Sequence, residues 1–432
     1  MKVLVVGGGS GGHITPAVST IRELLEISPR ARVEFWTDRK YYANVRKLTV
    51  LGDFSELEKI RVRKVLSGKF RRYAGWSFLD YFRNFKITVV DLVFKNIVGF
   101  FGFLGGLVQS FIRLAFPGKS GKFDVIFLKG GFVGLPVGMM ARVLKIPYVI
   151  HESDATPGLA NRILMRGAKV VATGSSFSSP EFEKKYRLKG RVEFTGTPVS
   201  EEFKRVSMSK EASLKRAFSF DPEKPLVVIT GGSQGAKHIN EAVKEILEEL
   251  LKFTSVGLVA GRKQYEELIE LKKYEVWEDA KLKSNFRMWE FNSTMNELMG
   301  AADLVVSRAG ATTIAELAAL GKAVILVPFE KLPGGHQVKN AEKLEAEGAA
   351  RVIRDEKMVK KPELLLEEIR TLIRSPKKRE ELKKKLGEGA RTGAARRLAE
   401  ILVEVGKGDF EGFGGGTRAS RFEKQGSRGK KG

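Results

Sequence analysis

The chain has 432 residues, and 43% of them are hydrophobic, which is enough to bury the cores of two domains. It contains no cysteine, so disulfides, thiolate metal sites and a cysteine nucleophile are excluded, and a reducing cytosol is expected. The formal net charge of +25 points to polyanionic partners, such as nucleic acid, anionic lipid or phosphorylated substrates.

The chain begins with a β-branched run, Val3–Val6, which leads into the glycine-rich loop Gly7–Gly12 and a helix from about Thr15. A strand at the very start predicts no signal peptide. Glycines between a strand and a helix leave backbone N–H groups unpaired, and with the helix dipole these form an anion site suited to phosphate. The construction recurs at the strand Leu226–Thr230 and the break Gly231–Gly232. The repeat predicts two α/β domains facing across a cleft.

Further strands are expected throughout the chain, with helices between them. In the first domain we predict them at Val33–Thr37, Asp124–Leu128, Pro147–His151, Val170–Ala172 and Val192–Phe194, and none in the basic stretch 39–75. In the second we predict them at Leu226–Thr230, Val256–Ala260, Phe286–Trp289, Leu304–Val306 and Val324–Val327. The alternation predicts doubly wound parallel sheets. We expect domains at 1–197 and 226–385, a connector at 198–225, and a disordered, basic, glycine-rich tail at 406–432.

The segment Ile87–Phe116 is unusually apolar, and the 17 residues from 96 to 112 carry no charge. Three interpretations are open: a buried helical hairpin, an apolar surface that dips into one leaflet, and a transmembrane span. The span is disfavoured because it needs about 20 apolar residues. Arginines and lysines flank the segment from about residue 69 onward, which favours the membrane-surface interpretation for 69–116.

Ligands of open α/β sheets lie beyond the carboxyl ends of the strands. All four histidines fall in or near the loops expected there, namely His13, His151, His238 and His336. The stretch Ser307–Thr313 follows the strand Leu304–Val306 and opens a further helix that carries Glu316. The amides of 311–313 are therefore placed to meet a phosphate, and Glu316 to accept from the ribose hydroxyls. Taken alone, Glu316 is better explained as a carboxylate that offsets the helix dipole.

Other chemistries fit fewer of these features. Gly7, Gly9 and Gly12, with Asp38 after the next strand, match a dinucleotide fingerprint, but a nicotinamide enzyme leaves the second loop and Glu316 unexplained. Gly231–Gly235 matches the letters of a serine-nucleophile elbow without a plausible Asp–His set. No D-x-D pair or H-E-x-x-H motif indicates a metal. The alternative of a basic RNA- or lipid-binding protein without enzyme activity is supported only by the net charge and the tail.

Six ordered motifs together resemble the MurG family of bacterial peptidoglycan glycosyltransferases. They are Gly8–His13, Lys129–Phe132, His151–Asp154, Gly231–Ala236, Ser307–Glu316 and His336–Ala341. The resemblance covers about residues 1–400 and implies a GT-B fold with a C-terminal helix, 386–405, that crosses back to the first domain. It also implies inverting transfer of N-acetylglucosamine from UDP-GlcNAc to the 4-hydroxyl of undecaprenyl-pyrophosphoryl-MurNAc-pentapeptide (lipid I), giving lipid II.

No cofactor, obligatory metal or nucleic-acid partner is implied by this resemblance. The implied location is peripheral, on an anionic membrane surface at the cytoplasmic side. The implied UDP-GlcNAc-binding residues are Ser10, Gly11, Gly12, Asp154, Ser233, Gln234, Ala311, Thr312, Thr313, Glu316, His336, Gln337 and Asn340. Lys129, Gly130, Gly131 and Phe132 are expected to face the acceptor pyrophosphate.

The general base that takes the proton of the acceptor hydroxyl is either His13 or Asp154. Asp154 stands where many relatives have asparagine, and a carboxylate accepts from sugar hydroxyls but does not donate to them. Ser200 replaces an arginine that some relatives place near the nucleotide. The apolar segment 87–116 and the tail after about 405 also depart from the family pattern.

Overall fold

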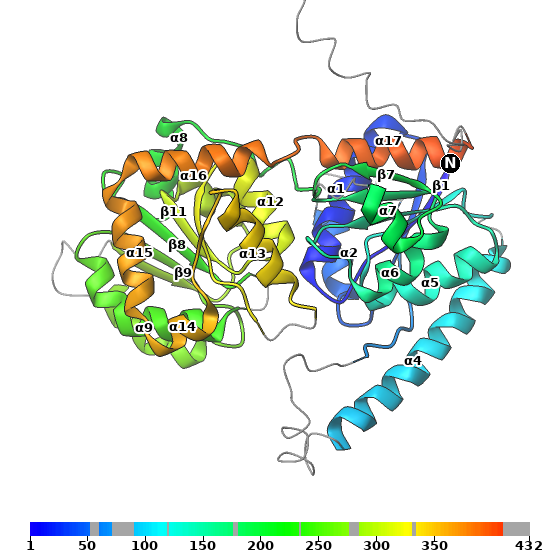
Figure 1. Cartoon of the computed structure of the whole chain (residues 1–432), viewed down its shortest axis with the longest axis horizontal. Helices are drawn as coiled ribbons and strands as arrows, with labels where there is room; N and C mark the ends of the chain where they lie inside the picture. Colours follow the sequence, from blue (N-terminus) through cyan, green and yellow to red (C-terminus); the bar gives the residue numbers. More distant parts are fainter. Residues whose placement is uncertain are drawn as a thin grey trace, which may run out of the picture.

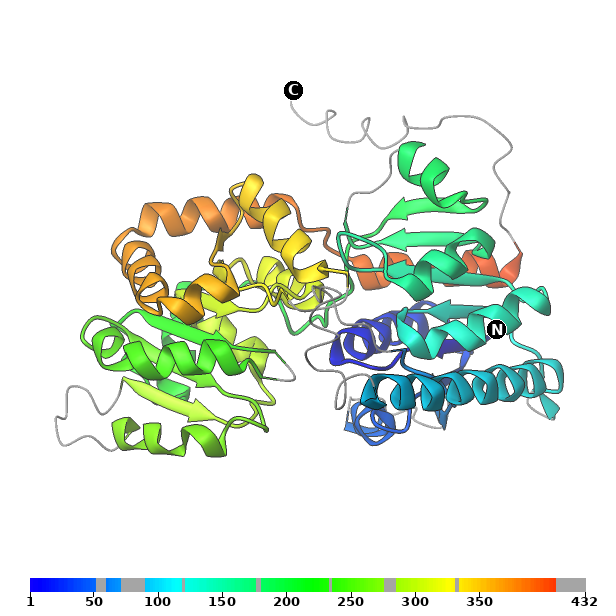
Figure 2. The ribbon, with the colours of Figure 1, turned by 60° about the horizontal axis from the view of Figure 1, so that its bottom comes forward.

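The computed structural model describes residues 1–51, 60–70, 90–118, 121–175, 180–232, 235–275, 285–330 and 334–408. Two α/β domains lie side by side in it, each built on one parallel sheet (Figures 1 and 2). The predicted fold class, two doubly wound parallel-sheet domains, is therefore confirmed.

The first domain has a seven-stranded sheet in the order β3-β2-β1-β4-β5-β6-β7, and every neighbouring pair is parallel. Its strands are β1 (Lys2–Val6), β2 (Arg32–Thr37), β3 (Ile60–Lys64), β4 (Val125–Leu128), β5 (Tyr148–Glu152), β6 (Val170–Thr173) and β7 (Arg191–Phe194). Its helices are α1 (Gly11–Ile27), α2 (Tyr42–Leu51), α4 (Val90–Ala115), α5 (Gly131–Val143), α6 (Leu159–Leu164) and α7 (Pro180–Tyr186), with a 3-10 turn, η4, at Met165–Gly167.

The second domain has a six-stranded parallel sheet in the order β10-β9-β8-β11-β12-β13. Its strands are β8 (Leu226–Thr230), β9 (Ser255–Val259), β10 (Phe286–Trp289), β11 (Leu304–Ser307), β12 (Ala323–Leu326) and β13 (Arg351–Val352). Its helices are α8 (Met208–Ala217), α9 (Lys237–Leu251), α11 (Met295–Ala301), α12 (Ala311–Leu320), α13 (His336–Ala346), α14 (Asp355–Lys360), α15 (Glu363–Arg374) and α16 (Pro376–Glu388), with a 3-10 helix, η5, at Glu266–Glu275.

Two strands were missed by the sequence analysis, and both lie at a sheet edge. The stretch 39–75 was expected to hold no strand, but β3 occupies Ile60–Lys64 there. Its sequence alternates apolar with basic residues, and Arg63 pairs with Glu34 of the neighbouring β2. The other, β13, has only two residues, too few to give a periodic signal.

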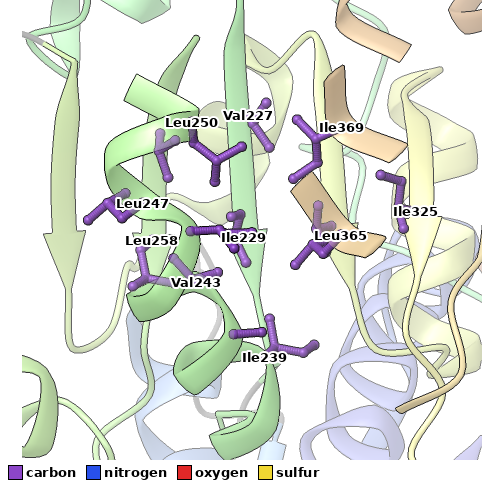
Figure 3. Close-up of a cluster of buried hydrophobic side chains, with 14 of the residues drawn as sticks. Val227, Ile229, Ile239, Val243, Leu247, Leu250, Leu258, Ile325, Leu365 and Ile369 are labelled. Atoms are coloured by element: carbon purple, nitrogen blue, oxygen red, sulfur yellow. The ribbon is translucent and has the colours of Figure 1, made fainter. Parts of the chain in front are cut away.

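Both faces of each sheet are covered, as the strand β8 illustrates. Its Val227 and Ile229 point into one core with α9 and α15, whereas Leu226 and Val228 belong to the core on the opposite face. Figure 3 shows the first of these cores, where side chains of β8 and α9 meet Leu365 and Ile369 of α15. A strand buried on both faces explains why Leu226–Thr230 is uniformly apolar rather than alternating.

The final helix, α17 (Ala394–Lys407), runs from the second domain back across the first (Figure 1). Its apolar stripe, Leu398, Ile401 and Leu402, is buried with residues of α1 in the first domain's core. Arg397 on its outer side binds Glu193 of β7 at 2.5 Å. The two domains are therefore joined at two places, by the connector before α8 and by the segment between α16 and α17.

The apolar segment forms a single continuous helix, α4, so the hairpin interpretation was wrong. Its glycines lie against the extended segment 66–69, and a Cβ atom on Gly106 would come within 2.3 Å of the Leu66 carbonyl oxygen. The opposite face is open, with Phe101 65% exposed. By length and composition α4 could cross a membrane over Val93–Ala115, and only 22% of its most apolar window is buried. In Figure 1 it runs along the lower side of the first domain.

Candidate active site

The glycine loop after β1 is held in place by Asp38, which follows β2. Asp38 Oδ2 accepts from the Gly9 amide at 2.7 Å, and its Oδ1 accepts from the amides of Lys40 and Tyr41. A Cβ atom on Gly8 would lie 2.5 Å from the same carboxylate, so glycine is required there. Asp38 is thus engaged on both oxygens and only 8% exposed, which argues against the ribose contact that a dinucleotide fingerprint needs.

The two domains meet at the N-termini of α1 and α12. Thr312 Oγ1 donates to the Gly12 carbonyl oxygen at 3.3 Å. The N-cap of α12 is Gly310, which has no side chain to bind the first-turn amides of Ala311, Thr312 and Thr313. Both helix dipoles present their positive ends at this contact, so an anionic group placed between them is stabilised from both domains.

Glu316 lies one turn further along α12 and is half-buried. Burial raises the pKa of its carboxyl to about 8. The group is therefore mostly protonated at neutral pH, and a neutral carboxyl offers a hydroxyl group, which donates, beside an oxygen that accepts.

A second interdomain contact joins the loop after β5 to α13. Asn340 Nδ2 donates to Asp154 Oδ1 at 3.0 Å, while its Oδ1 accepts from the Ala155 amide at 2.8 Å. His336 Nδ1 lies 3.0 Å from the Thr156 carbonyl oxygen and donates to it. Gln337 turns back into its own domain, where its Oε1 accepts from the Phe329 amide. Of the three residues of α13 that are expected to bind UDP-GlcNAc, two therefore touch the opposite domain directly.

His13 is close to the loop expected to face the acceptor. Its Nδ1 lies 2.7 Å from the Gly8 carbonyl oxygen, which can only accept, so Nδ1 carries the hydrogen and Nε2 keeps its lone pair. A Cβ atom on Gly131, the first residue of α5, would lie 2.9 Å from the imidazole ring. Burial, and then the charge of Lys129, lower the pKa of His13. A neutral imidazole with a free Nε2 is the form that a general base requires.

Lys129 lies beneath this loop rather than on the surface, with 2% of the residue exposed. Its Nζ donates to Ser153 Oγ at 2.7 Å, and Ser153 Oγ is 3.5 Å from His151 Nδ1. His151 Nε2 donates in turn to the Gly196 carbonyl oxygen at 2.8 Å. Burial lowers the pKa of Lys129 to about 8, although Glu152 and Asp154 oppose the shift.

Glu152 and Asn161 order the loop that carries Asp154, and the sequence analysis assigned neither a role. The Glu152 carboxylate accepts from the amides of Asp154 and Gly158 and from Asn161 Nδ2. Burial, and then the charge of Asp154, raise the pKa of Glu152. No sequence signal marks the contact between Glu152 and Asn161, which are nine residues apart, because this contact depends on how the loop folds back.

Ser233 and Gln234 lie outside the described residues. The helix α1 starts at Gly11 and Gly12, with Ser10 as its N-cap. Gly130 and Phe132 flank Gly131, the first residue of α5, which lies against the His13 ring. The Phe132 ring packs against Gly9, where a Cβ atom would come within 2.7 Å of it and where φ is +80°. Within the described ranges, no three His, Asp or Glu side chains come together as metal ligands.

Two parallel-sheet domains that meet through glycine loops and helix N-termini define a protein of the GT-B fold class. The chain belongs to glycosyltransferase family 28: residues 3–173 match the family's N-terminal domain and residues 226–398 its C-terminal domain.

Known relatives are similar over nearly the whole chain. A protein of Clostridium perfringens is 36% identical over 379 residues, which are 87% of this chain and 91% of that protein. A protein of Thermoanaerobacter sp. (strain X514) is 32% identical over 405 residues, 94% of this chain and 100% of that protein. Both are named UDP-N-acetylglucosamine–N-acetylmuramyl-(pentapeptide) pyrophosphoryl-undecaprenol N-acetylglucosamine transferase.

Solved structures share the fold at lower identity. MurG of Acinetobacter baumannii superposes with a TM-score of 0.65 at 24% identity, covering 93% of this chain and 99% of that one. UDP-GlcNAc 2-epimerase of Neisseria meningitidis, solved with UDP-GlcNAc, gives a TM-score of 0.59 at 14% identity, covering 94% and 100%.

Proposed function

We propose that this protein transfers N-acetylglucosamine from UDP-GlcNAc to the 4-hydroxyl of the MurNAc sugar in lipid I, giving lipid II for peptidoglycan synthesis. The observation that carries the proposal is the meeting of α1 and α12 at Gly12 and Thr312, with Glu316 one turn away. The two relatives described above, which are named for this transfer, match 94% and 87% of the chain.

The donor diphosphate lies between the two helix N-termini in this proposal. The amides of 311–313 and the loop Ser10–Gly12 stabilise the negative charge that develops on the departing UDP. Glu316 binds the ribose hydroxyls, and His336, Gln337 and Asn340 the sugar. Ser233, Gln234 and Asp154 complete the donor contacts.

His13 is the proposed general base. Its Nε2 takes the proton from the acceptor hydroxyl while that oxygen bonds to the anomeric carbon and the bond from this carbon to the β-phosphate oxygen breaks. Gly130, Gly131 and Phe132 meet the acceptor pyrophosphate at the N-terminus of α5, and Lys129 adds its charge from beneath. Asp154 is the second candidate for the base, but its Oδ1 already accepts from Asn340.

A membrane location at the cytoplasmic side is part of the proposal. Helix α4 offers an apolar outer face, and exposed Lys64, Lys69 and Lys122 lie in the segments before and after it. Basic side chains beside an apolar face favour an anionic lipid surface. Sedimentation with anionic vesicles tests this part independently of the chemistry.

Calorimetric titration with UDP-GlcNAc, with NADH as the control and a chelator present, tests the donor site. We expect UDP-GlcNAc alone to bind, and transfer to lipid I to follow when both substrates are supplied. Binding of NADH alone would mean that the glycine fingerprint of the first domain is the true signal and that the proposed function is wrong.

A further inference from the structure

A buried carboxylate in the second domain joins two segments that surround the donor site. Asp355, the first residue of α14, has a side chain 4% exposed. Its Oδ1 accepts from Arg308 Nη1, and its Oδ2 lies 2.5 Å from His238 Nδ1. Because the carboxylate accepts from the imidazole, Nδ1 carries the hydrogen.

The two partners of Asp355 come from different segments that follow strands of the second sheet. His238 is the second residue of α9, which follows the glycine loop after β8. Arg308 follows β11 and precedes Gly310, the N-cap of α12. The carboxylate therefore fixes the start of α9 relative to the start of α12, the two helices expected to hold the diphosphate and the ribose.

A third loop joins the same cluster through Phe329, which follows β12. The Arg308 guanidinium lies 5.2 Å from the centre of the Phe329 ring, and the His238 ring is 6.2 Å from it. Arg308 Nη1 also donates to the Val327 carbonyl oxygen at 3.0 Å. The Phe329 amide binds Gln337 Oε1, so the cluster reaches the expected sugar-binding helix.

We propose that Asp355 is a positioning residue that holds the start of α9, the loop between β11 and α12, and Phe329 in the arrangement that UDP-GlcNAc binds. The inference rests on the proposed function, since it assigns the donor to these loops. Asp355 itself touches no substrate; it acts through Arg308 and His238. A donor site ordered before binding does not lose loop freedom when the ligand arrives, so its affinity is higher.

The chemistry of the cluster suits this role better than apolar packing would. A buried carboxylate is costly unless it is paired and fully hydrogen-bonded, and here one side chain binds each of its two oxygens. The directional bonds fix both orientation and distance between three loops. Removing the carboxylate leaves Arg308, itself largely buried, without its ionic partner.

The test compares Asp355→Ala and Asp355→Asn with the unmodified enzyme. Calorimetry gives the Kd for UDP-GlcNAc, and steady-state kinetics give kcat and the separate KM values for donor and acceptor. We expect Asp355→Ala to raise the donor Kd and KM about tenfold or more, with kcat and the acceptor KM changed less than about twofold. Asp355→Asn, which keeps one acceptor oxygen, should fall between the two.

A matched control separates positioning from general destabilisation. Glu211→Gln breaks another ion pair of the same domain, with the buried Lys322, and Glu211 lies on α8 away from the donor loops. We expect this variant to lower the melting temperature while leaving the donor KM unchanged. A donor KM raised equally in Glu211→Gln and Asp355→Ala would overturn the proposal.

A second pair of variants covers the case in which Asp355→Ala does not fold. His238→Asn keeps an N–H donor near the position of Nδ1, whereas His238→Ala removes it, so only the alanine variant should raise the donor KM. Equal donor affinities in these two variants would also overturn the proposal. Failure of the unmodified enzyme to bind UDP-GlcNAc would instead reject the proposed function itself.

Discussion

At the scale of single residues, the structure assigns different protonation states to the groups expected to carry the chemistry. His13 is held neutral by burial and by Lys129, with Nδ1 committed to Gly8. Glu316 is held neutral by burial, because its pKa of about 8 lies above the usual value of a carboxyl. One group is thus ready to accept a proton and the other retains one, in a site that we propose binds an anionic donor.

His13→Ala should lower kcat about 100-fold or more, while the Kd for UDP-GlcNAc changes little. The physical reason is that a general base acts on the acceptor hydroxyl in the transition state and not on the bound donor. Single-turnover transfer and calorimetry measure the two quantities separately. Asp154→Asn serves as the comparison, and normal turnover in His13→Ala would move the role of the base to Asp154 or elsewhere.

Glu316→Gln should stabilise the protein more at high pH than at low pH. The folded state keeps a proton on Glu316 that the unfolded chain has lost between about pH 4.5 and pH 8, so the unmodified protein loses stability as pH rises through this window. Glutamine does not titrate. We expect the gain in unfolding free energy to grow to about 1–3 kcal/mol by pH 8.5.

Urea denaturation of both proteins at pH 5, 6.5 and 8.5 measures this difference. A gain that is the same at all three pH values would contradict the raised pKa.

The Kd for UDP-GlcNAc should rise in Glu316→Ala with the fold intact, and an unchanged Kd would remove Glu316 from the donor site.

Sequence alone could supply the motif residues but not most of their contacts. The loops and the N-terminus of α12 were predicted because glycine runs between a strand and a helix have a local meaning. The hydrogen bonds that join Asn340 to Asp154 and Ala155 were not predicted, because they depend on how two separately folded domains face each other. The role of Asp38 was not apparent for a related reason: an acid after β2 matches the ribose ligand of the rival dinucleotide fingerprint, and only the loop's path shows that it binds Gly9.

At the scale of elements, buried strands were predictable and marginal ones were not. Strands such as β8 are apolar on both faces, which gives a strong signal. The edge strand β3 contains three basic residues in five positions, so its composition resembles that of a loop. The helix α4 was recognised as unusual, but whether it folds into a hairpin depends on the glycine contacts with residues 66–69.

Charges on the outer face of α4 should release the protein from anionic vesicles. Phe94 and Phe101 are both exposed on that face. Phe94→Glu with Phe101→Glu places two carboxylates where apolar side chains would enter the lipid, which costs burial and adds repulsion from anionic headgroups. We expect vesicle binding to fall at least about tenfold, with transfer to a short-chain soluble acceptor retained.

Met208→Glu is the matched control for this prediction. Met208 is an exposed apolar residue on α8, in the other domain, so the same charge there should leave vesicle binding unchanged. Undiminished binding of the α4 variant would show that this helix is not the membrane contact.

At the scale of the whole molecule, two kinds of link control how the domains face each other. The connector before α8 and the segment before α17 join them covalently, and Arg391 in the latter stacks on Phe194 of β7. Hydrogen bonds from Thr312, His336 and Asn340 join the opposing loops. The second kind uses residues expected to bind the donor, so closure of the domains and binding of the donor depend on the same side chains.

Asn340→Ala should therefore shift the free protein toward a more open arrangement of its domains. The substitution removes the bonds to Asp154 and to the Ala155 amide, each worth about 1 kcal/mol, so the open fraction should rise about tenfold or more. Because the chain has no cysteine, Lys184→Cys on α7 and Glu245→Cys on α9 provide two unique sites for dyes. Single-molecule energy transfer between them reports the separation of the domains.

The control is Glu342→Ala on the same helix, because Glu342 binds Arg354 within its own domain. UDP-GlcNAc should restore the closed distribution in the control at lower concentration than in Asn340→Ala, since the donor must then supply the free energy that the lost bonds no longer provide. Identical distributions for the two variants, with and without donor, would show that the bonds of Asn340 do not hold the domains closed.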